Sequence, residues 1–117
     1  MTPEIDVLDS TLVARLQGEL DMQVTDALRS ALDQALNASG AKNMLFDLRL
    51  VSFIDSSGLG VILGRYRRIA DKGGRLAFVN VEPPVRRVLE LSGVLRISTE
   101  FQDEQQAIAD LAQGGLA

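Results

Sequence analysis

The chain has 117 residues, of which 46% are apolar and 24% charged, and its formal net charge at pH 7 is −4. This length and composition predict one soluble globular domain over 1–117. The acidic balance argues against nucleic acid as the main partner, because phosphate binding depends on clustered Lys and Arg. No apolar run approaches the roughly 20 residues that span a bilayer, and the N-terminus does not resemble a signal peptide. We therefore expect a cytoplasmic protein without membrane contact.

The sequence contains no cysteine and no histidine. Disulfides, thiol nucleophiles and the usual structural zinc sites are thereby excluded. A Ser-His-Asp triad cannot be assembled, and a metal ion would have to be held by oxygen ligands alone. Most familiar hydrolytic chemistry is absent, so we expect no catalytic residue, no metal site and no cofactor.

The N-terminal segment predicts a pair of strands. Apolar and polar residues alternate at period two over 5–16, the pattern of two half-buried strands that turn at 9–11. Gly18-Glu19-Leu20-Asp21 ends the second strand with a glycine and two acids. Asp21 is therefore expected on a loop, either as a solvated acid or free to bind a partner.

A helix is predicted next, because from about Val24 the leucines recur along one helical stripe. Thr25 or Asp26 can cap its start, and 37–40 closes it at a glycine.

The segment 43–48 is apolar on both parities apart from Asp47, as in a central strand covered on more than one side. After Asp55-Ser56-Ser57-Gly58, a helical pattern runs to about Lys72 and ends at Gly73-Gly74. The residues expected to face the core at helical spacing are Leu59, Ile62, Leu63, Tyr66, Ile69 and Ala70.

Gly60 and Gly64 fall on other faces of this helix, together with Val61, Arg65 and Arg68. A glycine inside a helix costs roughly 1 kcal/mol relative to alanine, so some packing should offset the cost. Either the helix packs closely on its own sheet, or another protein's surface approaches it. Both alternatives remain open from the sequence.

The rest of the chain predicts a buried strand over 75–81 and a short helix that begins at Glu82-Pro83-Pro84 and stops at Ser92-Gly93. A last strand is expected over 94–98. A final helix then opens at Gln102 or Asp103 and ends at Gly114-Gly115. The resulting order, β-β-α-β-α-β-α-β-α, predicts an α/β fold with a mixed sheet of four to five strands and about four helices.

The Asp55-Ser56-Ser57-Gly58 segment places a hydroxyl at the positive end of a helix, a location that suits an anion. Its glycines follow G-x-G-x-x-x-G, one residue too long for a dinucleotide fingerprint, and the Gly-Lys-Ser/Thr ending of a phosphate-binding loop is missing. A serine hydrolase would need a base, and Lys42 and Lys72 are the only lysines.

The remaining interpretations of these serines are a helix N-cap or a substrate for another enzyme. Phosphorylation adds about −1.5 to −2 charges, which the start of a helix tolerates. Beside Asp55, the added charge would repel a partner shaped for a neutral hydroxyl. Binding would change much more than stability, which is the property of a switch.

A family resemblance favours the switch. The segment FIDSSGLGVILGRY, from Phe53 to Tyr66, resembles the signature of the STAS domain of bacterial anti-sigma factor antagonists, above all the sporulation type that antagonises the anti-sigma F factor. Gly18-Glu19-Leu20-Asp21 is similar to the second family motif. The resemblance extends over nearly the whole chain. Gly73-Gly74, Pro83-Pro84 and Leu91-Ser92-Gly93 also lie where members of the family carry such residues.

The resemblance implies a partner-switching regulator of transcription and not an enzyme. The unphosphorylated form would bind an ATP-dependent serine kinase that doubles as the anti-sigma factor, and sigma factor would be released. Phosphorylation of Ser56 would break the complex, and a metal-dependent serine phosphatase would restore it. The protein itself is expected to be a monomer when free. The residues expected to bind the partner are Asp21, Asp55, Ser57, Gly58, Leu59, Gly60, Val61 and Gly64.

Three alternatives remain beside this one. A STAS domain linked to a transporter would accompany membrane helices. A small nucleotide-binding module would bind GTP or ATP saturably. A scaffold subunit of a stress-signalling assembly would self-associate and be indifferent to a kinase.

Overall fold

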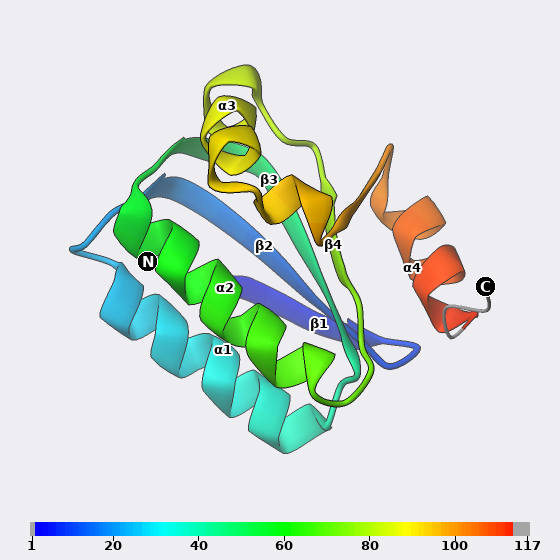
Figure 1. The fold of residues 1–117 in the computed structure, drawn as a ribbon. Helices are drawn as coiled ribbons and strands as arrows, with labels where there is room; N and C mark the ends of the chain where they lie inside the picture. Colours follow the sequence, from blue (N-terminus) through cyan, green and yellow to red (C-terminus); the bar gives the residue numbers. More distant parts are fainter. Residues whose placement is uncertain (1, 114–117) are drawn as a thin grey trace.

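The computed structural model describes residues 2–113, which form one five-stranded sheet and four α-helices (Figure 1). The elements in chain order are β1 (Glu4–Leu8), β2 (Thr11–Leu20), α1 (Thr25–Ser39), β3 (Asn43–Ile54), α2 (Ser56–Ala70), β4 (Leu76–Val79), α3 (Pro83–Ser92), a 3-10 turn (Val94–Arg96), β5 (Thr99–Phe101) and α4 (Glu104–Ala112). This order confirms the predicted α/β class. None of the helices in the described part of the chain has the length and apolarity to cross a membrane.

The sheet follows the strand order β1-β2-β3-β4-β5. β1 is antiparallel to β2, and the other neighbours are parallel, so the sheet is mixed as predicted. β4 pairs only with Met44 to Asp47 of β3, whereas β2 stays paired with β3 as far as Ile54. The carboxyl ends of β2 and β3 therefore extend together beyond the rest of the sheet.

Helices cover both faces of the sheet, because neighbouring residues of a buried strand point to opposite sides. α1, α2 and α3 cover one face (Figure 1), where the core includes the stacked rings of Phe46 and Phe78, 5.8 Å apart. The predicted leucine stripe of α1 is buried there. α4 covers part of the opposite face through a smaller cluster, made of Val13, Leu45, Ala77, Val79, Ala107 and Leu111.

Two predicted boundaries are wrong. β3 does not end near Leu48 but continues to Ile54, because register shifts opposite β2 let the pairing continue. The segment 94–98 is not a strand, because Val94 is buried in a 3-10 turn and the last strand begins only at Thr99.

The start of α1 also differs from the prediction, while several helix ends agree with it. Val24 is the N-cap residue of α1 and provides no side-chain cap, so neither Thr25 nor Asp26 has that role. The closing glycines at 40 and 93 adopt left-handed backbone conformations, as C-terminal stops require. Asp103 caps α4 as expected, and the predicted stop at Gly114-Gly115 lies outside the described residues.

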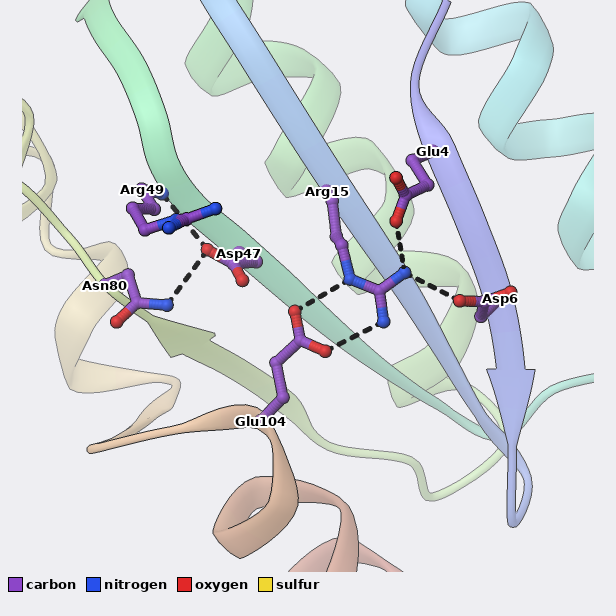
Figure 2. Close-up of polar contacts among 7 residues, drawn as sticks. All are labelled: Glu4, Asp6, Arg15, Asp47, Arg49, Asn80 and Glu104. Carbon is purple, nitrogen blue, oxygen red and sulfur yellow. Dashed lines mark hydrogen bonds and ion pairs between the residues drawn. The ribbon is translucent and has the colours of Figure 1, made fainter.

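Arg15 joins three elements on the second face of the sheet (Figure 2). Its Nε and Nη2 donate to the Glu104 carboxylate of α4 at 2.9 and 2.8 Å, and its Nη1 donates to Glu4 and Asp6 of β1 at 2.7 and 2.6 Å. These hydrogen bonds raise the pKa of Arg15 above its ordinary value, the contribution of Glu104 being the largest. No local sequence pattern indicates this network, because Glu104 is far from Arg15 along the chain.

Candidate protein-interaction site

The candidate site lies where β2 and β3 end side by side. Leu20 and Ile54, the last residues of the two strands, are register partners, and the Asp55 amide donates to the Leu20 carbonyl at 3.3 Å. The loop that carries Asp21 is therefore next to the turn that carries Asp55. Because β2 and β3 are parallel, both acids follow strand carboxyl ends at one edge of the sheet.

Asp55 caps the start of α2. Its Oδ1 accepts hydrogen bonds from the Ser57 hydroxyl at 2.5 Å, the Ser57 amide at 2.9 Å and the Gly58 amide at 3.1 Å. These bonds, with the Ser57 hydroxyl contributing most, lower the pKa of the Asp55 carboxyl below its ordinary value. The cap is thus ionised at neutral pH, and it is the acid, not a serine, that provides it.

The two serines after Asp55 differ in their environments. Ser57 is half-buried, and its hydroxyl donates to the Asp55 carboxylate. Ser56 is the first residue of the helix and is exposed, and its hydroxyl has no hydrogen-bond partner among residues 2–113. An enzyme that modifies a serine needs an accessible hydroxyl, which Ser56 offers and Ser57 does not.

Gly58 fixes the position of the helix start. A Cβ at this residue would lie 2.5 Å from the Leu20 carbonyl oxygen and 2.9 Å from a side-chain carbon of Ile54. Only glycine allows α2 to begin this close to the end of β2. Gly58 is also buried, so it positions the neighbouring residues and presents no side chain to a partner.

The other two glycines of α2 are Gly60, which is exposed, and Gly64, which is half-buried. Gly60 and Gly64 follow Ser56 at intervals of four residues, which places all three on one side of the helix. A Cβ at either glycine would meet no atom within 4 Å. Close packing of these glycines on the protein's own sheet, one of the two predicted alternatives, is therefore wrong. The approach of another molecule is the alternative that remains.

The neighbouring positions of α2 divide between surface and core. Leu59 is half-buried, and the predicted core positions Ile62 and Ile69 are buried. Val61 is fully buried, so its predicted role in partner binding is wrong. Arg65 was also expected on another face, yet it is buried beside Asp33 of α1, with Nε 3.2 Å from the carboxylate. Burial lowers the pKa of Arg65, and the Asp33 charge opposes that change.

Asp21 lies on the turn between β2 and α1, as predicted. It is half-buried, and its Oδ1 accepts the Gln23 amide at 3.0 Å while its carbonyl accepts the Val24 amide at 3.1 Å. The segments 17–24 and 50–64 around the site carry Glu19, Asp21 and Asp55 but no Lys or Arg. The site is therefore an acidic surface.

Two exposed apolar side chains at this edge were missed by the sequence reasoning. The exposed fraction is 74% for Met22, which follows Asp21, and 47% for Phe53, which precedes Asp55 by two residues. In the sequence, Phe53 begins the FIDSSGLGVILGRY segment, and no local pattern there indicates that its ring is exposed. The available signal was its place two residues before Asp55, at a strand end where burial is no longer assured.

A mixed five-stranded sheet, three helices on one face and an exposed serine at the start of the middle helix of the three define a small α/β domain. The family model described as "STAS domain" matches residues 2–107. The chain belongs to the STAS domain family.

Individual relatives agree with this assignment. The anti-sigma F factor antagonist of Paenibacillus polymyxa is 42% identical over 100 residues, which cover 86% of each chain. The solved structure of the Bacillus cell fate determinant SpoIIAA in its phosphorylated form has 30% identity and a TM-score of 0.73, covering 92% of this chain and 97% of that one. The structure of SpoIIAA in its unphosphorylated form has 26% identity and the same TM-score of 0.73, covering 97% and 99%.

Proposed function

We propose that this protein is an anti-sigma factor antagonist. In its unphosphorylated form it binds an anti-sigma factor, and the sigma factor that the anti-sigma factor had held is released. Relatives of two kinds support the proposal, because they are named as antagonists of anti-sigma F and of anti-sigma-B factors. The observation in the structure that carries it is the exposed Ser56 hydroxyl beside the ionised cap of α2.

Phosphorylation of Ser56 switches the protein off. The first turn of α2 accepts the added charge, because the phosphate faces the positive end of the helix dipole. The same charge changes the surface that a partner must contact, and it lies next to the Asp55 carboxylate. The fold is retained while the complex is lost.

The contact surface combines the loop after β2 with the exposed side of α2. Asp21 and Asp55 provide charge, and the two glycines at 60 and 64 let a partner approach the helix backbone. Gly58 contributes by allowing α2 to begin close to the end of β2. The residues proposed to contact the partner are Asp21, Asp55, Ser57, Leu59, Gly60 and Gly64.

The partner is a serine kinase that acts as the anti-sigma factor and uses ATP, and a metal-dependent serine phosphatase reverses its action. The protein has no catalytic function of its own in this scheme. It acts in the cytoplasm as a single domain over 1–117 and is a monomer when free.

A phosphorylation and binding assay tests the proposal. Incubation with a cognate anti-sigma kinase and Mg-ATP is expected to add one phosphate, located at Ser56 by mass spectrometry. Ser56→Ala should accept no phosphate, and Ser56→Asp should lose binding to the kinase in a pull-down or calorimetric titration. Phosphate on another residue, or wild-type affinity of Ser56→Asp, would contradict the assignment.

A further inference from the structure

Met22 and Phe53 are exposed apolar side chains on either side of the turn that begins α2. Met22 is 74% exposed, and its backbone adds a small contribution to the lowered pKa of the Asp55 carboxyl. Phe53 is 47% exposed and pairs with Glu19 across the strand ends. Both are thus tied by backbone contacts to the strand ends from which the Ser56 turn starts. Large apolar groups kept in water beside a functional turn are typical of an interaction site.

The backbone of β3 explains why Phe53 is outside. Beyond Leu48 the strand buries every third residue, Val51 and Ile54, instead of every second one. Register shifts opposite 15–17 and 18–19 of β2 accompany this change. The shifted strand keeps Ile54 in the core at the price of exposing Phe53. The bulged end of β3 therefore presents an aromatic ring that the fold itself does not use.

We infer that Met22 and Phe53 are the apolar anchors by which this protein docks on its anti-sigma factor. The inference rests on the proposed function and extends the contact surface from α2 across the ends of β2 and β3. Its occupant is a protein surface with apolar pockets set in a basic rim. The basic rim follows from charge complementarity. Glu19 pairs with Phe53, Asp21 precedes Met22 and Asp55 is two residues after Phe53, while 17–24 and 50–64 hold no Lys or Arg.

The arrangement divides recognition between two kinds of contact. The side of α2 with Gly60 and Gly64 permits close approach of a partner backbone. The side chains of Met22 and Phe53 supply apolar area that the partner buries. Buried apolar anchors commonly dominate the affinity of such interfaces, while the surrounding contacts exclude water. A phosphate on Ser56 would hold water and charge beside both anchors, so it would oppose their burial by the partner.

Binding of the full chain to a purified cognate anti-sigma kinase tests this inference. Met22→Ser and Phe53→Ser should each raise the dissociation constant by roughly tenfold or more. Leu8→Ser is the matched control, because Leu8 is 43% exposed but lies at the β1–β2 hairpin, at the opposite end of the sheet (Figure 1). That control should bind within about twofold of wild type. Raising the salt from about 0.05 to 0.5 M should slow association of the wild type.

The outcomes separate the two proposals. If the wild type binds the kinase and Met22→Ser and Phe53→Ser bind it equally well, the role of the two anchors is overturned while the proposed function stands. Failure of the wild type to bind any anti-sigma kinase would overturn the proposed function and the anchors with it. Phe53→Thr keeps a β-branched residue in the strand, so it tests the contact even where Phe53→Ser loosens β3. Unaltered thermal unfolding of each variant is expected, because neither side chain belongs to the core.

Discussion

At the start of α2, adjacent side chains have separate tasks. Asp55 and Ser57 satisfy the backbone donors of the first turn and each other, which leaves the Ser56 hydroxyl outside the cap. A modification of Ser56 therefore need not dismantle the structure that presents it. Had the modified hydroxyl been the one bonded to Asp55, phosphorylation would have removed a capping contact and disturbed the helix as well.

The charge of Asp55 is expected to contribute to stability at neutral pH. The pKa of Asp55 is lower in the folded protein than the ordinary value of 3.8. By linkage, a lowered folded-state pKa stabilises the protein above the unfolded value, and this contribution is lost as the pH falls through the folded one. Asp55→Asn keeps a good capping residue but removes the charge. We expect it to unfold at a lower temperature than wild type at pH 7, with the difference shrinking as the pH falls below 3.8.

Thermal unfolding followed by circular dichroism from pH 7 to about pH 2 measures this difference. Ser56→Ala serves as the control, because the exposed hydroxyl makes no hydrogen bond within residues 2–113 and its loss should not change stability at any pH. A difference between Asp55→Asn and wild type that stayed constant over the whole range would show that charge is not the cause.

At the scale of the element, α2 combines a glycine that the fold requires with glycines that it does not. Gly58 lies against the Leu20 carbonyl, while the space beside Gly60 is open. Gly58→Ala is expected to destabilise the protein by about 1–3 kcal/mol through this clash. Gly60→Ala should stabilise it by about 1 kcal/mol, because alanine favours the helix and meets no neighbour. Urea denaturation of the two variants measures both changes.

The same pair of variants separates stability from binding. Gly60→Ala adds a methyl group to the face where the partner is proposed to approach, so it should weaken binding to the anti-sigma kinase although the protein is more stable. Full affinity of Gly60→Ala would argue that the partner does not approach the helix at this glycine. Equal destabilisation by the two substitutions would contradict the packing described for Gly58.

The elements also show which sequence patterns predict structure here. The leucine stripe of α1 and the proline start of α3 depend on local spacing, and both predictions are confirmed. The end of β3 was missed because bulges replace its period of two by three, a change that the partner strand imposes. The segment 94–98 was misassigned because a buried 3-10 turn and a short strand have similar apolar composition. Arg65 was missed because its burial depends on Asp33 of another helix.

For the whole molecule, tertiary contacts join parts that no local pattern relates. Ser56 and Asp55 were recognisable because the motif is continuous, whereas the loop with Met22 and the strand end with Phe53 come to one edge of the sheet only when β2 and β3 pair. Arg15 and Glu104 are 89 positions apart, and their contact fastens α4 to the sheet (Figure 2). α1, α2 and α3 lie on the side of the sheet opposite to α4, so the contacts of α4 can be changed without a direct effect on the start of α2.

Arg15 is thus expected to control the docking of α4 and the edge strand together. Arg15→Met would leave Glu104, Glu4 and Asp6 facing one another without their shared cation, because the present hydrogen bonds all converge on this guanidinium. Bonds to charged groups of this kind contribute about 1.5–3 kcal/mol, so a loss of about 2 kcal/mol in urea denaturation is expected. Arg29→Met is the matched control, since the Arg29–Asp26 pair is a surface ion pair with side chains 47% and 94% exposed. Its removal should cost less than about 0.5 kcal/mol.

Hydrogen exchange shows where the structure loosens. Arg15→Met should speed exchange in α4 and β1 while α2 stays protected. Faster exchange throughout the sheet and in α2 would instead mean that Arg15 supports the entire core, and binding to the anti-sigma kinase would then fall with it.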